Sequence, residues 1–114
     1  MHVYGIKNCN TVKKALTWLE DEGIPFTFHD FKKEGVSREK LEAWEKQTGW
    51  EALVNKRGTT WRQLSPVEQQ AVVDASSANA LMQAKTSVIK RPVIESPNGI
   101  ILGFDEAEYR NKLK

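Results

Sequence analysis

Cysteine is almost absent from this sequence, whose 114 residues include only one, Cys9. A single cysteine excludes a disulfide within the chain. The two histidines, His2 and His29, have no ligand partners at the spacing of a zinc site, so we expect no bound metal. The sequence also lacks a glycine-rich phosphate loop and a serine-histidine pair in a recognised catalytic motif. Cys9 is therefore the residue with the most specific chemical case.

Long hydrophobic runs and an excess of one charge are missing too. The apolar runs are far shorter than a bilayer span, and the N-terminus lacks the charged and apolar regions of a signal peptide. We therefore expect a soluble, cytoplasmic protein with no membrane partner. Seventeen Lys and Arg and fifteen Asp and Glu leave a net charge of +2. Because the two signs are interspersed, we expect no nucleic-acid partner.

The length and composition are typical of a protein that folds unaided. Hydrophobic residues make up 39% and charged residues 28% of the chain, as in ordinary globular proteins. A chain of this length buries a core without metal or disulfide staples. We predict a single domain over residues 1–114.

The first 31 residues predict a β-α-β unit. Residues 2–6 have the pattern of a short strand. From Asn10 onward, apolar residues recur with helical spacing until Gly23. Residues 26–31 alternate aromatic and polar side chains, which predicts a second strand, parallel to the first. The predicted inward-facing residues of the helix are Val12, Ala15, Leu16 and Leu19.

Residues from about 37 to 86 predict a helical insertion. Ser37 is placed to cap a helix that Gly49 ends, and Ser65 to Glu68 form a capping box with proline at the first helical position. Ser76 or Ser77 is expected to cap a further helix. The residues expected to face inward include Leu41 and Trp44 in the first helix, Val67, Ala71 and Val72 in the second, and Leu81 and Met82 in the third.

The last quarter of the chain predicts a hairpin and a helix. Two β-branched runs, 93–94 and 100–101, are joined by Ser96-Pro97-Asn98-Gly99, which has the chemistry of a hairpin loop. Asp105 with Glu108 three residues later predicts a helix over about 106–113. The predicted order is therefore β-α-β, helical insertion, β-β-α, an α/β fold.

Cys9 lies where the first helix begins, which favours a thiolate. The free N–H groups and the dipole of a first turn stabilise an anion, and Lys7 and Lys13 add positive charge. The alternative is an inert buried cysteine. The polar neighbours Asn8 and Asn10 argue against a fully apolar environment.

Two further segments carry candidate residues. Arg91-Pro92 precedes the third predicted strand, where a cis bond and an ordinary strand-entry proline remain alternatives. The loop 55–62 contains Arg57 with other basic residues and Trp61. This loop is either a carboxylate-binding site or simply solvated.

Together the segments NCNTVKKALTWLEDEGIPFTFHDF, LVNKRGTTWR and KRPVIESPNGIILGF resemble the arsenate reductase-related (ArsC) family, and within it the YffB branch, which is similar to the Spx regulators. The resemblance implies a thioredoxin-like fold with a mixed four-stranded sheet. It also implies that Cys9 is a redox nucleophile, that Arg91 reaches its thiolate, and that a cis Pro92 lines the substrate groove.

The sequence also departs from this family pattern. Asn55 and Phe104 stand where glutaredoxin-dependent arsenate reductases have arginines, and each charge-assisted hydrogen bond that is lost is worth about 1.5 to 3 kcal/mol. Spx regulators commonly carry a Cys-x-x-Cys switch, but Val12 occupies the second position here. The resemblance therefore favours neither arsenate reduction nor an intramolecular disulfide switch.

The function predicted from these residues and from the family resemblance together is a glutathione-dependent thiol/disulfide oxidoreductase. Cys9 and Arg91 are the predicted catalytic residues. Glutathione is the expected co-substrate, no cofactor is expected to stay bound, and either glutathione or glutaredoxin resolves the mixed disulfide. The alternative is a non-catalytic, Spx-like protein that binds RNA polymerase or another partner, and arsenate reduction ranks third. The predicted substrate-binding residues are Asn8, Asn10, Arg57 and Pro92.

Overall fold

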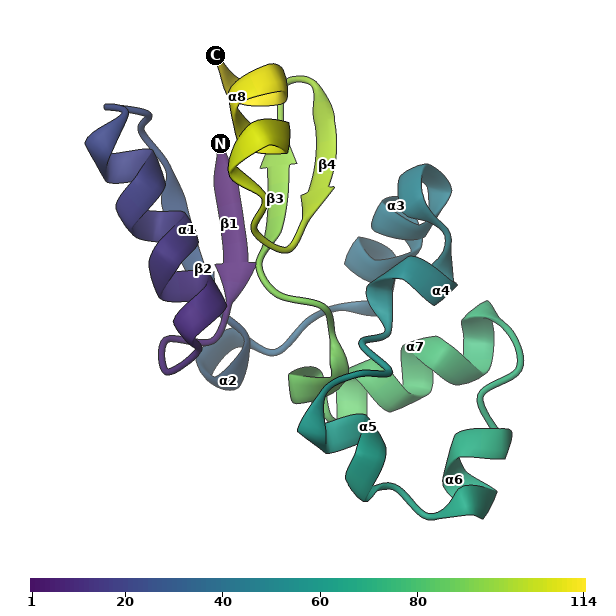
Figure 1. Ribbon diagram of the computed structural model, residues 1–114. Helices are drawn as coiled ribbons and strands as arrows, with labels where there is room; N and C mark the ends of the chain where they lie inside the picture. The colour runs from purple at the N-terminus through teal and green to yellow at the C-terminus, as the bar shows by residue number, and fades with distance from the viewer. The chain divides into compact units, whose positions relative to one another are not determined.

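The sheet that organises the N- and C-terminal parts of the chain has four strands, in the order β2-β1-β3-β4. The computed structural model describes residues 1–114 and divides them into two compact units. Unit 1 comprises Met1–Glu34 and Arg91–Lys114, and unit 2 comprises Gly35–Lys90. The sheet belongs to unit 1, and most of the helices belong to unit 2 (Figure 1).

The sheet of unit 1 is mixed, as predicted. Strand β1 (His2–Gly5) pairs in parallel with β2 (Thr27–Asp30) and antiparallel with β3 (Val93–Ser96). Strand β3 forms the predicted hairpin with β4 (Gly99–Leu102). The register places Val3 opposite Phe28 on one side and Ile94 on the other. Because side chains alternate along a strand, Val3 and Ile94 point to the same face.

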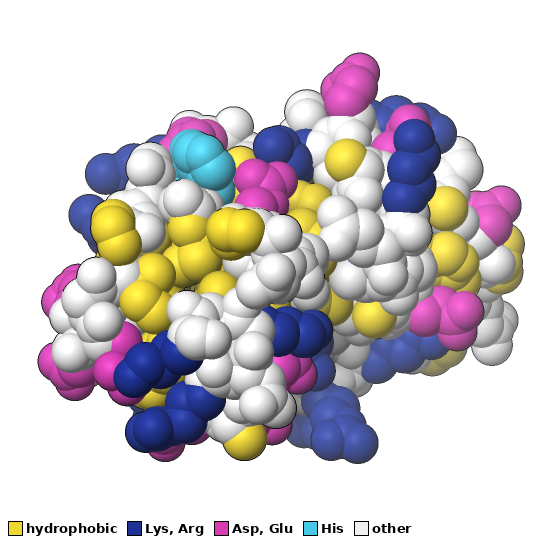
Figure 2. Space-filling view, turned by 90° about the horizontal axis from the view of Figure 1, so that it is seen from above, with side chains coloured by type: hydrophobic (Ala, Val, Ile, Leu, Met, Phe, Trp, Pro, Cys, Tyr) yellow, Lys and Arg dark blue, Asp and Glu magenta, His cyan; other side chains and the backbone are white.

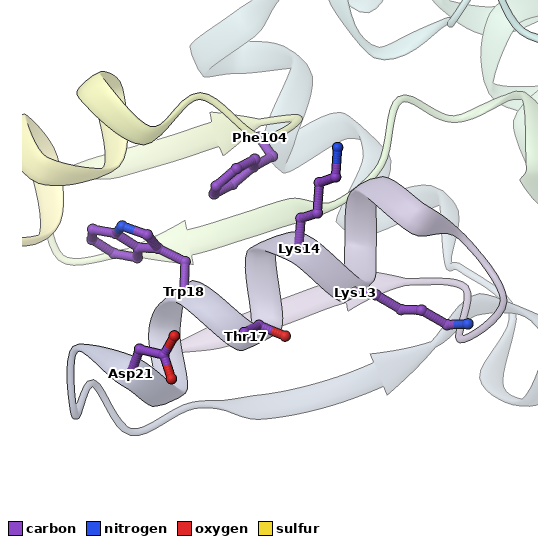
Figure 3. Close-up of a pocket in the computed structure, with 6 residues that line it drawn as sticks. All are labelled: Lys13, Lys14, Thr17, Trp18, Asp21 and Phe104. Carbon is purple, nitrogen blue, oxygen red and sulfur yellow. The ribbon is translucent and has the colours of Figure 1, made fainter.

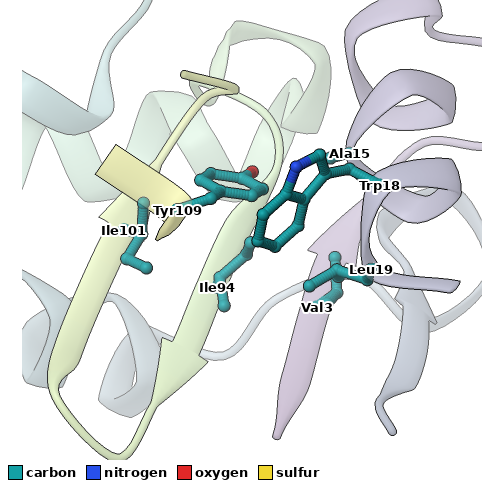
Figure 4. Close-up of a cluster of buried hydrophobic side chains, with 7 residues drawn as sticks. All are labelled: Val3, Ala15, Trp18, Leu19, Ile94, Ile101 and Tyr109. Carbon is teal, nitrogen blue, oxygen red and sulfur yellow. The ribbon is translucent and has the colours of Figure 1, made fainter. Parts of the chain in front are cut away.

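Helices α1 (Asn10–Asp21) and α8 (Glu106–Leu113) pack their apolar residues on that face. Trp18 of α1 and Tyr109 of α8 meet edge to face, with ring centroids 5.4 Å apart. Figure 4 shows these rings above the strands. The buried cluster of unit 1 contains Val3, Ala15, Trp18, Leu19, Ile94, Ile101 and Tyr109.

The boundaries of unit 1 follow the sequence prediction with one correction. The expected strand over residues 26–31 ends earlier, because Phe31 begins a short helix, α2 (Phe31–Glu34). The backbone N–H of Lys32 donates to the Asp30 carboxylate at 2.9 Å. That local side-chain bond turns the chain out of the strand.

Hydrophobic surface remains at the end of unit 1 where both termini lie. Figure 2 shows this end, with hydrophobic side chains among charged ones. A hollow of about 340 Å³ there is lined by Met1, Ile24, Pro25, Pro97 and Leu113 together with polar residues. The ammonium of Lys114, which also lines this hollow, forms an ion pair with Glu22 at 3.0 Å.

Unit 2 is built from short helices. Its longest are α3 (Arg38–Thr48) and α7 (Ala75–Ala84). The amide of Asn79, buried in α7, hydrogen-bonds the Glu45 carboxylate of α3. Burial raises the pKa of Glu45. The other elements are α4 (Trp50–Leu53), α5 (Thr59–Gln63), α6 (Pro66–Gln70) and the 3₁₀ turn η1 (Thr86–Val88).

The caps of unit 2 are partly as predicted. Ser37 caps α3, and Ser65 and Glu68 form the expected capping box at α6. The prediction for α7 was wrong: Asp74 is its N-cap, and Ser77 is the third helical residue of a second capping box. Both residue types cap helices well, so the pattern fits two registers and packing selects one.

The predicted inward face of α6 was also wrong. Val67 is 76% exposed, Ala71 is exposed and Val72 is only half-buried. Helix α6 ends at Gln70 after five residues, which is less than two turns and too short to present a continuous buried stripe.

Candidate active site at the first turn of helix α1

Cys9 is the N-cap residue of α1. Its backbone is extended, with φ of −110° and ψ of 123°, and its carbonyl accepts the N–H of Lys13 at 3.0 Å. A cysteine at this position brings no side-chain oxygen to the unpaired N–H groups of the first turn. Cys9 accordingly makes no side-chain cap hydrogen bond, but the N–H groups of Val12 and Thr11 favour the charged form of its sulfur.

The pairing of β1 with β3 brings Arg91 close to Cys9. Strands β1 and β3 are antiparallel, with Tyr4 opposite Val93. The residues just before β3 therefore lie beyond the C-terminal end of β1, which is the end from which the chain leads to Cys9. The Arg91 side chain hydrogen-bonds the Cys9 thiol, and the Arg91–Pro92 peptide bond is cis.

These contacts lower the pKa of Cys9 below its ordinary value of 9.0. Burial acts against this, because removing water disfavours the charged thiolate. The N–H groups of Val12 and Thr11 and the hydrogen bond and charge of Arg91 outweigh burial. Low thiol pKa is the property that distinguishes reactive cysteines from structural ones.

The remaining predicted residues of unit 1 surround this pair. Asn8 and Asn10 flank Cys9 and are both exposed, whereas Pro92 is buried. Lys7 and Lys13, which we expected to add positive charge, are exposed. The structure therefore brings Cys9 and Arg91 together and leaves both asparagine side chains accessible.

Sequence reasoning missed Gly103, which hydrogen-bonds the residue next to Arg91. The N–H of Gly103 donates to the carbonyl of Pro92 at 2.9 Å, and Gly103 has a φ of 76°, which favours glycine. The hydroxyl of Tyr109 donates to the Gly103 carbonyl at 2.6 Å. A glycine directly after a β-branched strand was the available signal, but it does not reveal its partner.

Arg57 lies in unit 2, on a turn that Asn55 organises. The Asn55 side-chain oxygen accepts the N–H of Arg57 at 3.2 Å, and its carbonyl accepts the N–H of Gly58 at 3.2 Å. The Lys56 ammonium lies 5.4 Å from the centroid of the Trp61 ring. With Lys90, Lys56 and Arg57 line a hollow of about 420 Å³ that also contains Glu51. This lining suits a carboxylate or another anion.

No group of three or more His, Cys, Asp or Glu is arranged to hold a metal ion. No helix combines the length and the hydrophobicity required to cross a membrane.

Comparison with known proteins places this geometry in a family. The model of the ArsC family matches residues 4–112. The chain belongs to the ArsC family. An uncharacterized protein of Haemophilus influenzae is 44% identical over 95% of this chain and 94% of its own length. The Spx 1 global transcriptional regulator of Oceanobacillus iheyensis is 25% identical over 97% of this chain and 85% of its own length.

Two solved structures of ArsC-type proteins are also similar. The YffB (PA3664) protein superposes with a TM-score of 0.92 at 41% identity, covering 99% of this chain and 98% of its own. An arsenate reductase (ArsC) related protein from Brucella melitensis gives a TM-score of 0.76 at 49% identity, covering 99% and 93%. The predicted resemblance and the predicted thioredoxin-like fold are therefore confirmed.

Proposed function

We propose that this ArsC-family chain is a glutathione-dependent thiol reductase whose nucleophile is Cys9. The observation that carries the proposal is the position of Cys9 at the N-cap of α1 with the Arg91 side chain beside it, which lowers the thiol pKa. A thiolate is the attacking species in thiol-disulfide exchange, and it also leaves more readily when its pKa is low. One cysteine is sufficient, because glutathione supplies the second thiol.

The proposed cycle balances with two exchanges. The Cys9 thiolate attacks the glutathione sulfur of a mixed disulfide, a Cys9-glutathione disulfide forms, and the substrate sulfur leaves as a thiolate that takes a proton from water. A second glutathione thiolate then attacks the bound glutathione sulfur and releases the Cys9 thiolate with oxidised glutathione. Overall, one free glutathione thiol is consumed: its sulfur is oxidised as oxidised glutathione forms, and the substrate sulfur is reduced to a thiol.

Each predicted residue has a role in this proposal. Arg91 stabilises the Cys9 thiolate and binds a carboxylate of the ligand. Asn8, Asn10 and Pro92 border the bound glutathione, and Arg57 binds a glutathione carboxylate in the hollow of unit 2. Glutaredoxin replaces the second glutathione if the adduct is resolved by a protein.

The test uses glutathione with the mixed disulfide of glutathione and 2-mercaptoethanol. Wild-type protein should turn over this substrate, and its intact mass should show one bound glutathione after oxidised glutathione is added. Cys9→Ser should lose both properties while keeping its circular dichroism spectrum. An unchanged rate in Cys9→Ser contradicts the proposal.

A second candidate is a non-catalytic, Spx-like protein that binds RNA polymerase or another partner. The likeness to Spx regulators over 97% of this chain favours it. Capture of the RNA polymerase α subunit that survives Cys9→Ser, together with no turnover by wild type, would support this function. Arsenate reduction stays third, because Asn55 uses its side chain to form the turn that precedes Arg57.

A further inference from the structure

A hollow of about 380 Å³ runs along the exposed side of α1 and uses none of the proposed catalytic residues. It is lined by Lys13, Lys14, Thr17, Trp18, Asp21 and Phe104. Figure 3 shows that five of these residues come from α1 and that Phe104 comes from the connection between β4 and α8. The rings of Trp18 and Phe104 lie on the same side of the helix, with Lys14 beside Phe104. We call this hollow the α1 groove.

The aromatic side of the α1 groove is rigid. Tyr109 packs edge to face on Trp18 and on Phe104, with centroid distances of 5.4 and 5.0 Å. Its hydroxyl also bonds the carbonyl of Gly103, the residue before Phe104, at 2.6 Å. The two rings are therefore held in place before any ligand arrives, which lowers the entropic cost of binding.

The α1 groove begins one helical turn after Cys9. Lys13 bonds the Cys9 carbonyl through its N–H, so its Cα lies about 6 Å further along the helix, and Asp21 lies about 18 Å from Cys9 at 1.5 Å per residue. An extended peptide advances about 3.3 Å per residue. An extended segment of about five to six residues that starts at a disulfide engaged by Cys9 would therefore reach Asp21, and roughly its last four residues would lie along the groove.

The two ends of the α1 groove carry opposite charges. Lys13 and Lys14 lie at the end near Cys9, and Asp21 lies at the far end. A complementary segment is acidic close to its disulfide and carries an apolar side chain further away, against Phe104 and Trp18. Glutathione has no apolar side chain to place there. The Asp21 carboxylate and the presence of only two lysines disfavour nucleic acid.

We propose that the α1 groove binds the peptide segment next to the disulfide of a protein substrate, and that it selects acidic residues followed by a large apolar one. This inference rests on the proposed thiol reductase function. It assigns Lys14 and Phe104 to substrate selection, whereas Cys9 and Arg91 carry the chemistry.

The test compares three glutathione mixed disulfides. One is a peptide that carries glutamate at the second position and leucine at the fourth position on each side of its cysteine. The second has lysine in place of glutamate, and the third is the 2-mercaptoethanol disulfide. For wild-type protein we expect kcat/KM to be about fivefold or more higher for the acidic peptide than for the basic one, as opposed charge pairs predict.

Two variants test which residues cause this preference. Lys14→Glu should reverse the preference for the acidic peptide, and Phe104→Ala should lower kcat/KM for both peptides relative to the 2-mercaptoethanol disulfide. Lys33→Glu changes the net charge equally from an exposed position in α2 and should leave the preference unaltered. Lys14 is exposed, so its replacement tests the groove even if Phe104→Ala is poorly folded.

The outcomes separate the two proposals. If the 2-mercaptoethanol disulfide is turned over and both peptides react at equal rates, the proposed peptide binding in the α1 groove is wrong and the thiol reductase proposal stands. An equal change of preference in Lys33→Glu and Lys14→Glu also overturns it, because the effect would then come from net charge. No turnover of any of the three disulfides overturns the thiol reductase and the groove together.

Discussion

The N–H of Gly103 donates to the carbonyl of Pro92 at 2.9 Å. This bond joins the residue that follows Arg91 to the residue that precedes Phe104. The hydroxyl of Tyr109, in α8, holds the other side of Gly103. The thiolate site at one end of α1 and the aromatic wall beside α1 thus share one backbone support.

Arg91→Ala should raise the pKa of Cys9 toward its ordinary value of 9.0, because the variant loses both a hydrogen bond and a positive charge at the sulfur. Alkylation by iodoacetamide as a function of pH measures this directly, since the chain has one cysteine. Arg91→Lys keeps the charge but not the planar donor group, and should give a midpoint between the two. Equal midpoints in wild type and Arg91→Ala would show that the arginine does not act on the thiol.

The lowered pKa of Cys9 also makes stability depend on pH. The folded protein binds the thiol proton less tightly than the unfolded chain does. This contribution to stability is therefore fully present above the unfolded thiol pKa and is lost as pH falls through the folded value. Urea unfolding of wild type and Cys9→Ser should show a difference that grows with pH across this window. A constant difference would contradict the shift.

Gly5→Ala should disturb the packing of β1 against α1. A Cβ at Gly5 would lie 2.9 Å from one methyl carbon of Val12, and Val12 is fully buried and stiff at χ1. We expect a loss of about 1 to 3 kcal/mol in the free energy of unfolding. In Gly5→Ala/Val12→Ala the new methyl group has room, so the loss should be smaller than the sum of the two single losses. Strict additivity in urea denaturation would refute the predicted clash.

Tyr109→Phe should cost about 1 to 3 kcal/mol, because the Gly103 carbonyl loses its buried donor. Burial raises the pKa of Tyr109 well above its usual 10.0, so the hydroxyl stays protonated and remains a donor. Tyr4→Phe is the matched control, since the Tyr4 hydroxyl bonds Glu95 at 3.1 Å in a half-buried position. Thermal and urea unfolding should show the larger loss for Tyr109→Phe, and a larger loss for Tyr4→Phe would contradict the buried brace.

Arg57→Ala should raise KM for glutathione by about tenfold if Arg57 binds a carboxylate through a charge-assisted bond. Arg62→Ala removes an equally exposed charge from the neighbouring helix α5 and should leave KM near the wild-type value. Steady-state kinetics at varied glutathione distinguishes the two variants. The same KM in both would remove Arg57 from the predicted site.

Local signals explain how much of this fold the sequence predicts. Helix caps and tight turns act within a few residues, so they can be predicted without the tertiary structure. Examples are the caps Ser37 and Ser65 and the turn at Ser96–Gly99. Val67 and Asp74 show the limit. Whether a short helix buries a valine, or which of two good caps is used, is decided by packing partners that lie far away in the sequence.

The candidate site also has features that the local sequence predicts and features that depend on distant partners. The place of Cys9 before a helix is a local pattern, and it suffices to predict a reactive thiol. The approach of Arg91 depends on the antiparallel pairing of β1 and β3, and the sequence suggests it only through the family resemblance. For the bond between Gly103 and Pro92, the sequence offers only a glycine after a β-branched strand, which does not reveal the partner.

Unit 1 is discontinuous, because Cys9 lies in its first segment and Arg91 opens its second, with all of unit 2 between them in the chain. On the ribosome, strand β1 and helix α1 therefore emerge long before β3 and β4 do. Until the last quarter of the chain has been made, Cys9 lacks the hydrogen bond and the positive charge of Arg91 that help to lower its pKa. The thiol therefore reaches its full reactivity only at the end of synthesis, when β3 pairs with β1 and brings Arg91 to the sulfur.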